Sequence, residues 1–260
     1  MMTHARVGLL VAAGISVAAR AARSLTTSGA LAATLVGTLA VAAGWDWGVL
    51  LILYFASSTV LSRLGRARKE DLTSAVVAKG GQRDAIQVLA NGGVFSAAAI
   101  AMLIQPDVRW IALGAGSLAA ATADTWATEV GTLYGGTPRS ILTWRRVPTG
   151  TSGGVSLIGT VGTLAGATFI ALVAWMLGWT PRVAALVGIG GVAGALADSV
   201  IGATVQARRW CDACQLETER HTHSCGAETR PLRGIAWLDN DAVNFLSNAA
   251  GGILSALIVR

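Results

Sequence analysis

Four aspartates lie near the ends of long apolar segments of the chain: Asp84, Asp124, Asp198 and Asp241. Carboxylates at or inside a membrane are rare and usually functional. If the four segment ends reach the same membrane surface, their negative charges repel one another unless a cation lies among them. Oxygen ligands favour Mg²⁺, which commonly binds together with substrate phosphates. The aspartates therefore predict the catalytic centre of a magnesium-dependent phosphate reaction.

The magnesium ligands predicted from this pattern are Asp124, Asp198, Asp241 and Glu129. Glu129 follows Asp124 by five residues, an offset that places the two side chains about 140° apart on an ideal helix. Both reach one ion only if the helix breaks or bulges between them. The simpler alternative for a single carboxylate is that it caps a helix or pairs with an arginine of a loop.

Two polar stripes begin at the first and last of these aspartates. Their members are Asp84, Gln87 and Asn91 in one segment, and Asp241, Asn244 and Asn248 in another, where Asn240 directly precedes Asp241 as a further candidate for substrate binding. At offsets of three, four and seven residues, side chains share one face of a helix. Such groups are costly against lipid, so they must face other helices or a wet cavity. Interhelical hydrogen bonds alone are the alternative, but two matched stripes headed by aspartate favour a site whose amides orient a phosphate.

A loop rich in glycine and hydroxyl groups offers a second place for phosphate. It comprises Pro148, Thr149, Gly150, Thr151, Ser152, Gly153 and Gly154. Glycine allows close backbone approach, hydroxyls donate hydrogen bonds, and the N-terminus of a following helix carries partial positive charge. The loop lacks the Gly-Lys-Ser/Thr of a Walker A sequence, and a flexible turn is the alternative. The basic residues expected to clamp phosphate oxygens are Lys79, Arg83, Arg145 and Arg146.

All three cysteines of the chain lie in one polar segment, at Cys211, Cys214 and Cys225. With His221 or His223 they provide four ligands for a tetrahedral Zn²⁺ site. Four protein ligands leave no position for substrate, so the sequence favours structural zinc over catalytic zinc. A loop with free thiols is the alternative, and a reducing compartment argues against a disulfide.

Eight apolar segments must position these residues, at 7–22, 28–44, 47–62, 84–104, 108–131, 155–178, 183–206 and 241–259. A membrane-spanning helix needs about 20 residues. Of the 260 residues, 53% are hydrophobic and only 13% are charged, whereas a soluble domain has about 25% charged residues. We therefore predict an all-α fold, a polytopic transmembrane bundle of seven or eight helices. It forms one domain over 1–260, with the Cys/His loop at 207–240 as an insert.

Lysine and arginine are unevenly distributed between the two sides of this bundle. They gather in the loops at 63–83, 132–154 and 207–240, while the other side holds four arginines, at positions 6, 109, 182 and 260. This asymmetry predicts that the three loops are cytoplasmic, in a plasma membrane of prokaryotic type, and that the site is on the cytoplasmic side. Because the basic residues lie in short loops between apolar segments, the net charge of +6 does not indicate nucleic-acid binding.

Parts of the chain also echo one another. The residues at 84–91 match those at 241–248 in spacing, and Ala123-Asp124-Thr125 matches Ala197-Asp198-Ser199. If the echo is real, it is an internal pseudo-repeat in which two halves contribute like elements to one site, as in other membrane folds. Chance similarity between alanine-rich helices is the alternative.

At 84–91, 123–131, 148–156, 197–206 and 240–248 the sequence resembles the integral-membrane family that includes plant phytyl phosphate kinase. The resemblance extends from about residue 24 onward, and the Cys/His insert is similar to that of many bacterial members. It implies a kinase that transfers a phosphoryl group from a nucleoside triphosphate, with CTP the expected donor, to an isoprenyl monophosphate. The lipid tail is expected between helices faced with alanine and glycine, in contact with membrane lipids. Alternatives are cytidylyl transfer to the same lipid, or a secondary transporter of a phosphorylated or cationic solute.

Overall fold

A computed structural model describes residues 2–259, and within that range the chain forms nine α-helices and five short β-strands. The helices are α1 (Met2–Ala21), α2 (Thr27–Ala43), α3 (Trp45–Arg63), α4 (Arg66–Thr73), α5 (Ala85–Ile104), α6 (Val108–Tyr134), α7 (Leu157–Met176), α8 (Pro181–Thr204) and α9 (Asn240–Ile258). The strands are β1 (Arg139–Ser140), β2 (Gly154–Val155), β3 (Arg208–Cys211), β4 (Leu216–Thr218) and β5 (Arg230–Arg233). Each of the eight apolar segments expected from the sequence corresponds to one helix, and α4 is an additional short helix in a polar loop.

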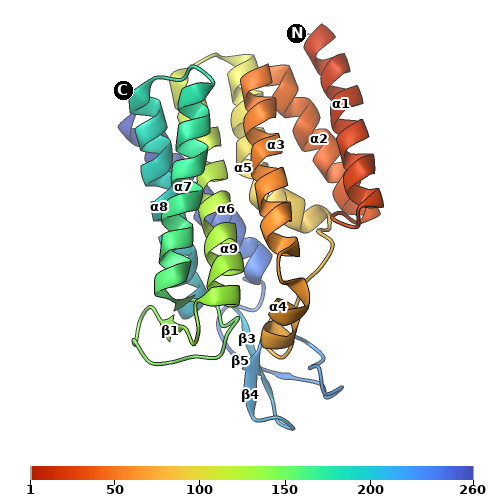
Figure 1. Ribbon diagram of the computed structural model, residues 1–260, viewed down its shortest axis with the longest axis vertical. Coiled ribbons are helices and arrows are strands. Elements are labelled where there is room, and N and C mark those ends of the chain that lie inside the picture. Colours follow the sequence, from red (N-terminus) through yellow and green to blue (C-terminus); the bar gives the residue numbers. More distant parts are fainter. Residues whose placement is uncertain (1, 260) are drawn as a thin grey trace.

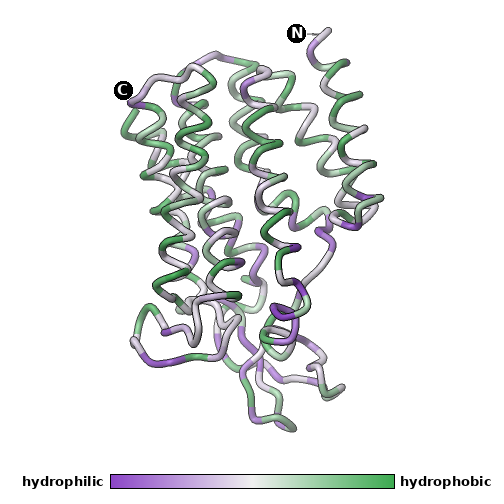
Figure 2. The backbone as a smooth tube through the Cα atoms, viewed as in Figure 1, coloured by the Kyte–Doolittle hydropathy of each residue, from purple (hydrophilic) through white to green (hydrophobic). Residues whose placement is uncertain are grey.

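Six of these helices are long and apolar enough to cross a membrane: α1, α3, α5, α7, α8 and α9. The six confirm a helical membrane bundle, although the sequence predicted seven or eight spans. Helix α2 is shorter, with 17 residues. Helix α6 is long but consists largely of alanine, glycine, serine and threonine, which lowers its hydropathy. In Figure 2 the bundle is mostly apolar, and the polar segments gather at one end.

Helix α6 is the centre of the bundle, in contact with α3, α5, α7, α8 and α9. Small side chains allow helix backbones to approach closely in a membrane. A Cβ atom added at Gly162 of α7 would lie 2.9 Å from the carbonyl oxygen of Trp126, and one at Gly166 would lie 2.9 Å from that of Thr122. A helix surrounded by other helices needs no large lipid-facing side chains, which explains why α6 is rich in alanine, glycine, serine and threonine.

Polar side chains mark where the helices begin. The N-cap residues whose side chains accept a backbone N–H are Thr26 for α2, Asp84 for α5, Asp107 for α6, Ser156 for α7, Thr180 for α8 and Asp239 for α9. Each such bond satisfies a donor that the first turn leaves unpaired. A tight turn joins α2 to α3, with Gly44 ending α2 and preceding α3.

The loops that carry the polar motifs meet at one end of the bundle, and both termini lie at the other end (Figure 1). This end is not purely helical, so the all-α prediction needs correction there. Strands β1 and β2 form an antiparallel pair, and the Cys/His insert contains a three-stranded antiparallel sheet in the order β4-β3-β5. A turn at Gln215, whose φ is +52°, reverses the chain between β3 and β4. The strands have only two to four residues, too few for hydropathy to reveal them.

Candidate active site

A cavity of about 330 Å³ lies at the loop-bearing end of the bundle. It is bordered by the starts of α5 and α9, the linker between α4 and α5, and the three-stranded sheet. Its charged and polar lining residues are Lys79, Gln87, Gln206, Arg208, Arg209, Glu219, His221, Arg233, Asp239, Asn240 and Asp241. Of these, the sequence had predicted Lys79, Gln87, Asn240 and Asp241. The cavity therefore contains part of each polar stripe together with charged groups of the insert.

Lys79 joins the beginnings of the two polar stripes. Its Nζ lies 2.5 Å from Oδ2 of Asp241 and 3.4 Å from Oδ2 of Asp84. Deeper in the bundle, Nδ2 of Asn248 donates to the carbonyl oxygen of Ala90 at 3.2 Å and to Oδ1 of Asn91 at 3.5 Å. The two stripes, far apart in sequence, thus face each other across α5 and α9. Asn244, one turn before Asn248, is half-buried.

The two aspartates that begin the stripes have different structural roles. Asp84 is the N-cap of α5 and forms a capping box with Gln87, in which each side chain accepts the other residue's backbone N–H. Asp241 lies inside the first turn of α9, where the cap is Asp239. Burial raises the pKa of Asp84, but the Gln87 N–H and the charge of Lys79 outweigh it, and the net pKa lies below its ordinary value. The sequence echo therefore preserves the shared face but not the capping position.

Asp124 and Asp198 come from the neighbouring helices α6 and α8, and neither lines the cavity. Ser247 of α9 donates its hydroxyl to Oδ2 of Asp198 at 3.1 Å. Within residues 2–259, neither aspartate has an ion-pair partner. Two carboxylates on neighbouring helices, with no cationic partner among the described residues, offer the oxygen ligands that Mg²⁺ prefers.

Glu129 points to a different partner. It forms an ion pair with Lys69 of α4 and accepts a hydrogen bond from Ser62 at 2.5 Å. Helix α6 runs without a break from Val108 to Tyr134, so the break or bulge required to bring Glu129 beside Asp124 is absent from it. Glu129 therefore joins α4 to α6, and we leave it out of the magnesium site.

The glycine loop at 148–154 is packed against helices and does not form an open cradle. Gly150 has a φ of +89°, and an added Cβ would meet the Thr73 and Val77 side chains at 3.1 Å. Gly153 has a φ of +76°, and an added Cβ would lie 2.4 Å from that of Ala203 in α8. The backbone N–H groups of Thr151 and Gly154 donate to carbonyl oxygens within the loop. The glycines thus serve close packing.

The expected contribution of a helix N-terminus to this loop is also not met. Strand β2 separates the loop from α7, and Ser156 already caps that helix by accepting the N–H of Gly159 at 3.0 Å. The groups of this loop that could still bind a ligand are the side-chain hydroxyls of Thr149, Thr151 and Ser152. The Ser152 hydroxyl donates to Oε1 of Glu219 at 2.7 Å.

The structure separates the four predicted phosphate clamps. Lys79 lines the cavity. Arg83 lies over the ring of Phe55, 5.9 Å from its centroid, and donates to Ser62 at 3.4 Å. Arg145 and Arg146 are exposed on the connection between β1 and β2 and do not line the cavity. A role for the last two in phosphate binding stays a prediction.

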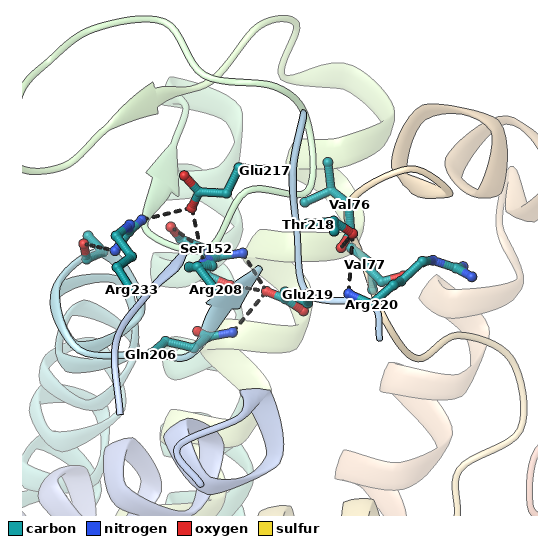
Figure 3. A network of polar contacts seen from close by, with 11 residues as sticks. Val76, Val77, Ser152, Gln206, Arg208, Glu217, Thr218, Glu219, Arg220 and Arg233 are labelled. Atoms are coloured by element: carbon teal, nitrogen blue, oxygen red, sulfur yellow. Dashed lines mark hydrogen bonds and ion pairs between the residues drawn. The ribbon is translucent and has the colours of Figure 1, made fainter. Parts of the chain in front are cut away.

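A polar network that connects the insert to Ser152 and Gln206 was missed by sequence reasoning (Figure 3). Oε1 of Glu219 accepts hydrogen bonds from Ser152 at 2.7 Å, Gln206 at 2.8 Å and Arg208 at 2.8 Å. The Arg208 side chain is fully buried, and Glu217 lies 3.5 Å from its Nε. Charged and uncharged residues alternate along Glu217-Thr218-Glu219, and this short period of two was the available signal for a strand.

The three cysteines and one histidine of the insert converge. One ligand atom from each of Cys211, Cys214, His223 and Cys225 lies within 4.8 Å of the others. A backbone N–H from Ala227 and a hydrogen bond with His223 lower the pKa of the Cys225 thiol to about 6, whereas hydrogen bonds with Cys225 and Cys211 raise the pKa of the Cys214 thiol to about 11. His221 is outside this group and lines the cavity. Of the two histidines left open by the sequence, the geometry selects His223.

Comparison with known proteins agrees with the membrane bundle. The family model described as "Integral membrane protein DUF92" matches residues 10–252. The chain belongs to this family. The family membership expected from the motifs is thereby confirmed, and the protein is an integral membrane protein. No solved structure matches the chain.

Relatives within the DUF92 family come from a plant and an archaeon. Protein PGR of Arabidopsis thaliana is 30% identical, over 90% of this chain and 89% of that protein. An uncharacterized membrane protein of Methanocaldococcus jannaschii is 29% identical, over 97% of this chain and 93% of its own. Protein VTE6, chloroplastic, of Arabidopsis thaliana is 31% identical, over 90% of this chain and 65% of its own length.

Proposed function

We propose that this DUF92 protein is a magnesium-dependent kinase that transfers a phosphoryl group to an isoprenyl monophosphate, of the phytyl or geranylgeranyl type, to give the diphosphate. The expected donor is a nucleoside triphosphate, with CTP preferred. The observation that carries the proposal is the pair Asp124 and Asp198 on the neighbouring helices α6 and α8, which have no ion-pair partner within residues 2–259, in a bundle whose loop-bearing end has a polar cavity. Family membership and the resemblance of the motifs to phytyl phosphate kinase support the choice of substrate.

The proposed magnesium site consists of Asp124 and Asp198, because their carboxylate oxygens match the preferred ligands of that ion. Bound there, Mg²⁺ supplies neutralisation of the charge on phosphate oxygens. Phosphoryl transfer requires mainly positioning and charge stabilisation and needs no covalent nucleophile. Ser247, which donates to Asp198 at 3.1 Å, holds that carboxylate in place.

The two polar stripes are proposed to hold the acceptor phosphate. Asp84 and Asp241 fix Lys79 at the cavity, where its ammonium can bind phosphate oxygens. Asn91, Asn244 and Asn248 lie on the same faces and orient the acceptor phosphate by hydrogen bonds. Its prenyl tail extends between α-helices into lipid, which gives a kinase a reason to be embedded in the membrane.

The site is proposed to face the cytoplasm. Helix ends and loops rich in lysine and arginine lie at the cavity's end of the bundle, and such loops remain on the cytoplasmic side. Nucleoside triphosphates are available on that side. A transporter would place its binding groups near the middle of the membrane, whereas the cavity here lies at one end.

A second metal, Zn²⁺, is proposed at the Cys/His group, where its role is structural. Three sulfurs and one imidazole nitrogen complete the usual tetrahedral set and leave no open position for a substrate. The two metals are thus assigned to different parts of the molecule.

The test is a reaction of the purified protein in liposomes with Mg²⁺, CTP and geranylgeranyl or phytyl monophosphate, with products identified by mass. Prenyl diphosphate and CDP are expected, and their formation should fall at least about 1,000-fold in Asp124→Asn and Asp198→Asn. Asp107→Asn is the matched control, since Asp107 caps the opposite end of α6. Full activity in both site variants, or no nucleotide consumption by well-folded protein, would overturn the proposal.

A further inference from the structure

The Cys/His group joins two parts of the insert that lie apart in sequence. Cys211 ends β3 and Cys214 lies in the turn before β4, while His223 and Cys225 lie in the segment between β4 and β5. An ion bound by all four would therefore connect the turn between β3 and β4 to the segment between β4 and β5. His223 is buried, and its Nε2 has no hydrogen-bond partner among the described residues.

The spacing of the ligand atoms fits zinc. The sulfurs of Cys211 and Cys225 are 3.7 Å apart, and Nδ1 of His223 is 3.2 Å from the Cys225 sulfur. With Zn–S bonds of about 2.3 Å, a tetrahedral ion places two sulfurs about 3.8 Å apart. The sheet has strands of three or four residues, and such small units usually need a metal or disulfide to be stable.

The same sheet contacts the linker between α4 and α5, which borders the cavity. Thr218 donates its hydroxyl to the carbonyl oxygen of Val76 at 3.2 Å, and the N–H of Glu219 donates to that oxygen at 2.9 Å. Nε of Arg220 donates to the carbonyl oxygen of Val77 at 2.9 Å. These bonds fix the linker that continues to Lys79.

Glu219 extends the connection to the glycine loop. It accepts the Ser152 hydroxyl at 2.7 Å, while Arg208, buried in β3, holds the Glu219 carboxylate at 2.8 Å. Hydrogen bonds from one short sheet thus hold the 76–79 linker on one side and the 148–154 loop on the other (Figure 3).

We infer that Zn²⁺ bound by Cys211, Cys214, His223 and Cys225 assembles one wall of the cavity. Glu219 is the positioning residue, because its hydrogen bond with Ser152 holds the 148–154 loop against the sheet. Without the ion, the ends of β3 and β4 lose their connection to the 223–225 segment. The bonds of Glu219 to the loop, and of the sheet to the linker, then weaken together. The meaning of this wall for catalysis rests on the proposed function, but the ion and its effect on the loops do not.

The first experiment measures zinc and backbone exchange without any substrate. Purified protein in detergent is expected to contain one zinc per chain by elemental mass spectrometry, and Cys214→Ser and Cys225→Ser at least about tenfold less. Hydrogen exchange is expected to accelerate in 76–79 and 148–154 in both variants, while the interiors of α6 and α8 stay protected. His221→Ala is the matched control, because this histidine is outside the ligand group, and it should retain zinc.

Removing zinc from the wild-type protein with a chelator, then adding ZnCl₂, avoids reliance on variants that fail to fold. Exchange in both segments should rise on removal and return on addition. Absence of zinc from the purified protein would overturn the metal site. Zinc loss without faster exchange at 148–154 would overturn the connection to the loop.

Glu219→Gln separates positioning from metal binding. It is expected to keep one zinc per chain yet accelerate exchange at 148–154, and to raise the KM for the prenyl phosphate more than it lowers kcat, because Glu219 lines the cavity. Unchanged exchange in Glu219→Gln would contradict its role as the connecting residue. If the kinase assay fails while zinc and exchange behave as expected, the proposed function falls and the zinc-assembled wall stands.

Discussion

Replacing Lys79 by methionine should destabilise the protein through the charge that it leaves on Asp241. The Asp241 side chain is only 6% exposed, and the nitrogen of Lys79 lies 2.5 Å from its Oδ2. Breaking a fully buried pair costs about 3–5 kcal/mol, whereas an exposed pair contributes about 1 kcal/mol or less. Because the Lys79 side chain is 42% exposed, solvent screens the pair, and we expect a loss of about 2 kcal/mol in the free energy of unfolding.

The assay is thermal unfolding of the purified protein in detergent. A loss of that size corresponds to a decrease of roughly 4–8 °C in melting temperature. Arg66→Met is the matched control, since the exposed pair of Arg66 with Glu70 should account for less than about 2 °C. In the double variant Lys79→Met/Asp241→Asn the uncompensated charge is gone, so part of the lost stability should return. Equal melting temperatures for Lys79→Met and the double variant would refute the reasoning.

Three further results are expected from the packing and pairing of the site. Glu129→Gln should lower the melting temperature, because Lys69 loses its ion-pair partner, but leave the magnesium dependence of the rate unchanged; a shift in the magnesium requirement would restore Glu129 as a ligand. Gly153→Ala should sharply reduce folded yield in size-exclusion chromatography, because its Cβ would lie 2.4 Å from that of Ala203, whereas Gly178→Ala, also at positive φ but in open space, should be mild; equal yields would contradict the close packing. Asn248→Leu should lower kcat/KM for the prenyl phosphate by about tenfold or more, because the hydrogen bonds to Ala90 and Asn91 are lost, and an unchanged value would argue for a purely structural amide.

Hydropathy located the helices well because lipid requires long apolar segments. Every expected segment became a helix, and the capping residues Asp84 and Ser156 set boundaries that hydropathy alone leaves uncertain. The spacing of the polar stripes correctly placed their members on shared faces. That Lys79 joins Asp84 to Asp241 could not be read from spacing, because it depends on how α5 and α9 lie against each other.

The remaining features depend on packing, which composition does not reveal. A glycine-rich loop has the same composition whether its glycines admit a ligand or a neighbouring helix, and in the structure Gly150 and Gly153 pack against other segments. Phosphate binding by this loop stays a prediction. Glu129 lies five residues after Asp124, and the regular geometry of α6 directs it to Lys69. The pairing of Arg208 with Glu219 depends on the register of strands too short to recognise from sequence.

The most direct test of the central claim follows the γ-phosphate of CTP. Protein in liposomes is incubated with Mg²⁺, geranylgeranyl monophosphate and CTP labelled at that phosphate, and lipids are separated from nucleotides. We expect the label in prenyl diphosphate, with unlabelled CDP released, and no transfer in Asp198→Asn. Label released as pyrophosphate together with a CDP-linked lipid would show cytidylyl transfer, and label remaining in CTP would contradict an enzyme acting on these substrates.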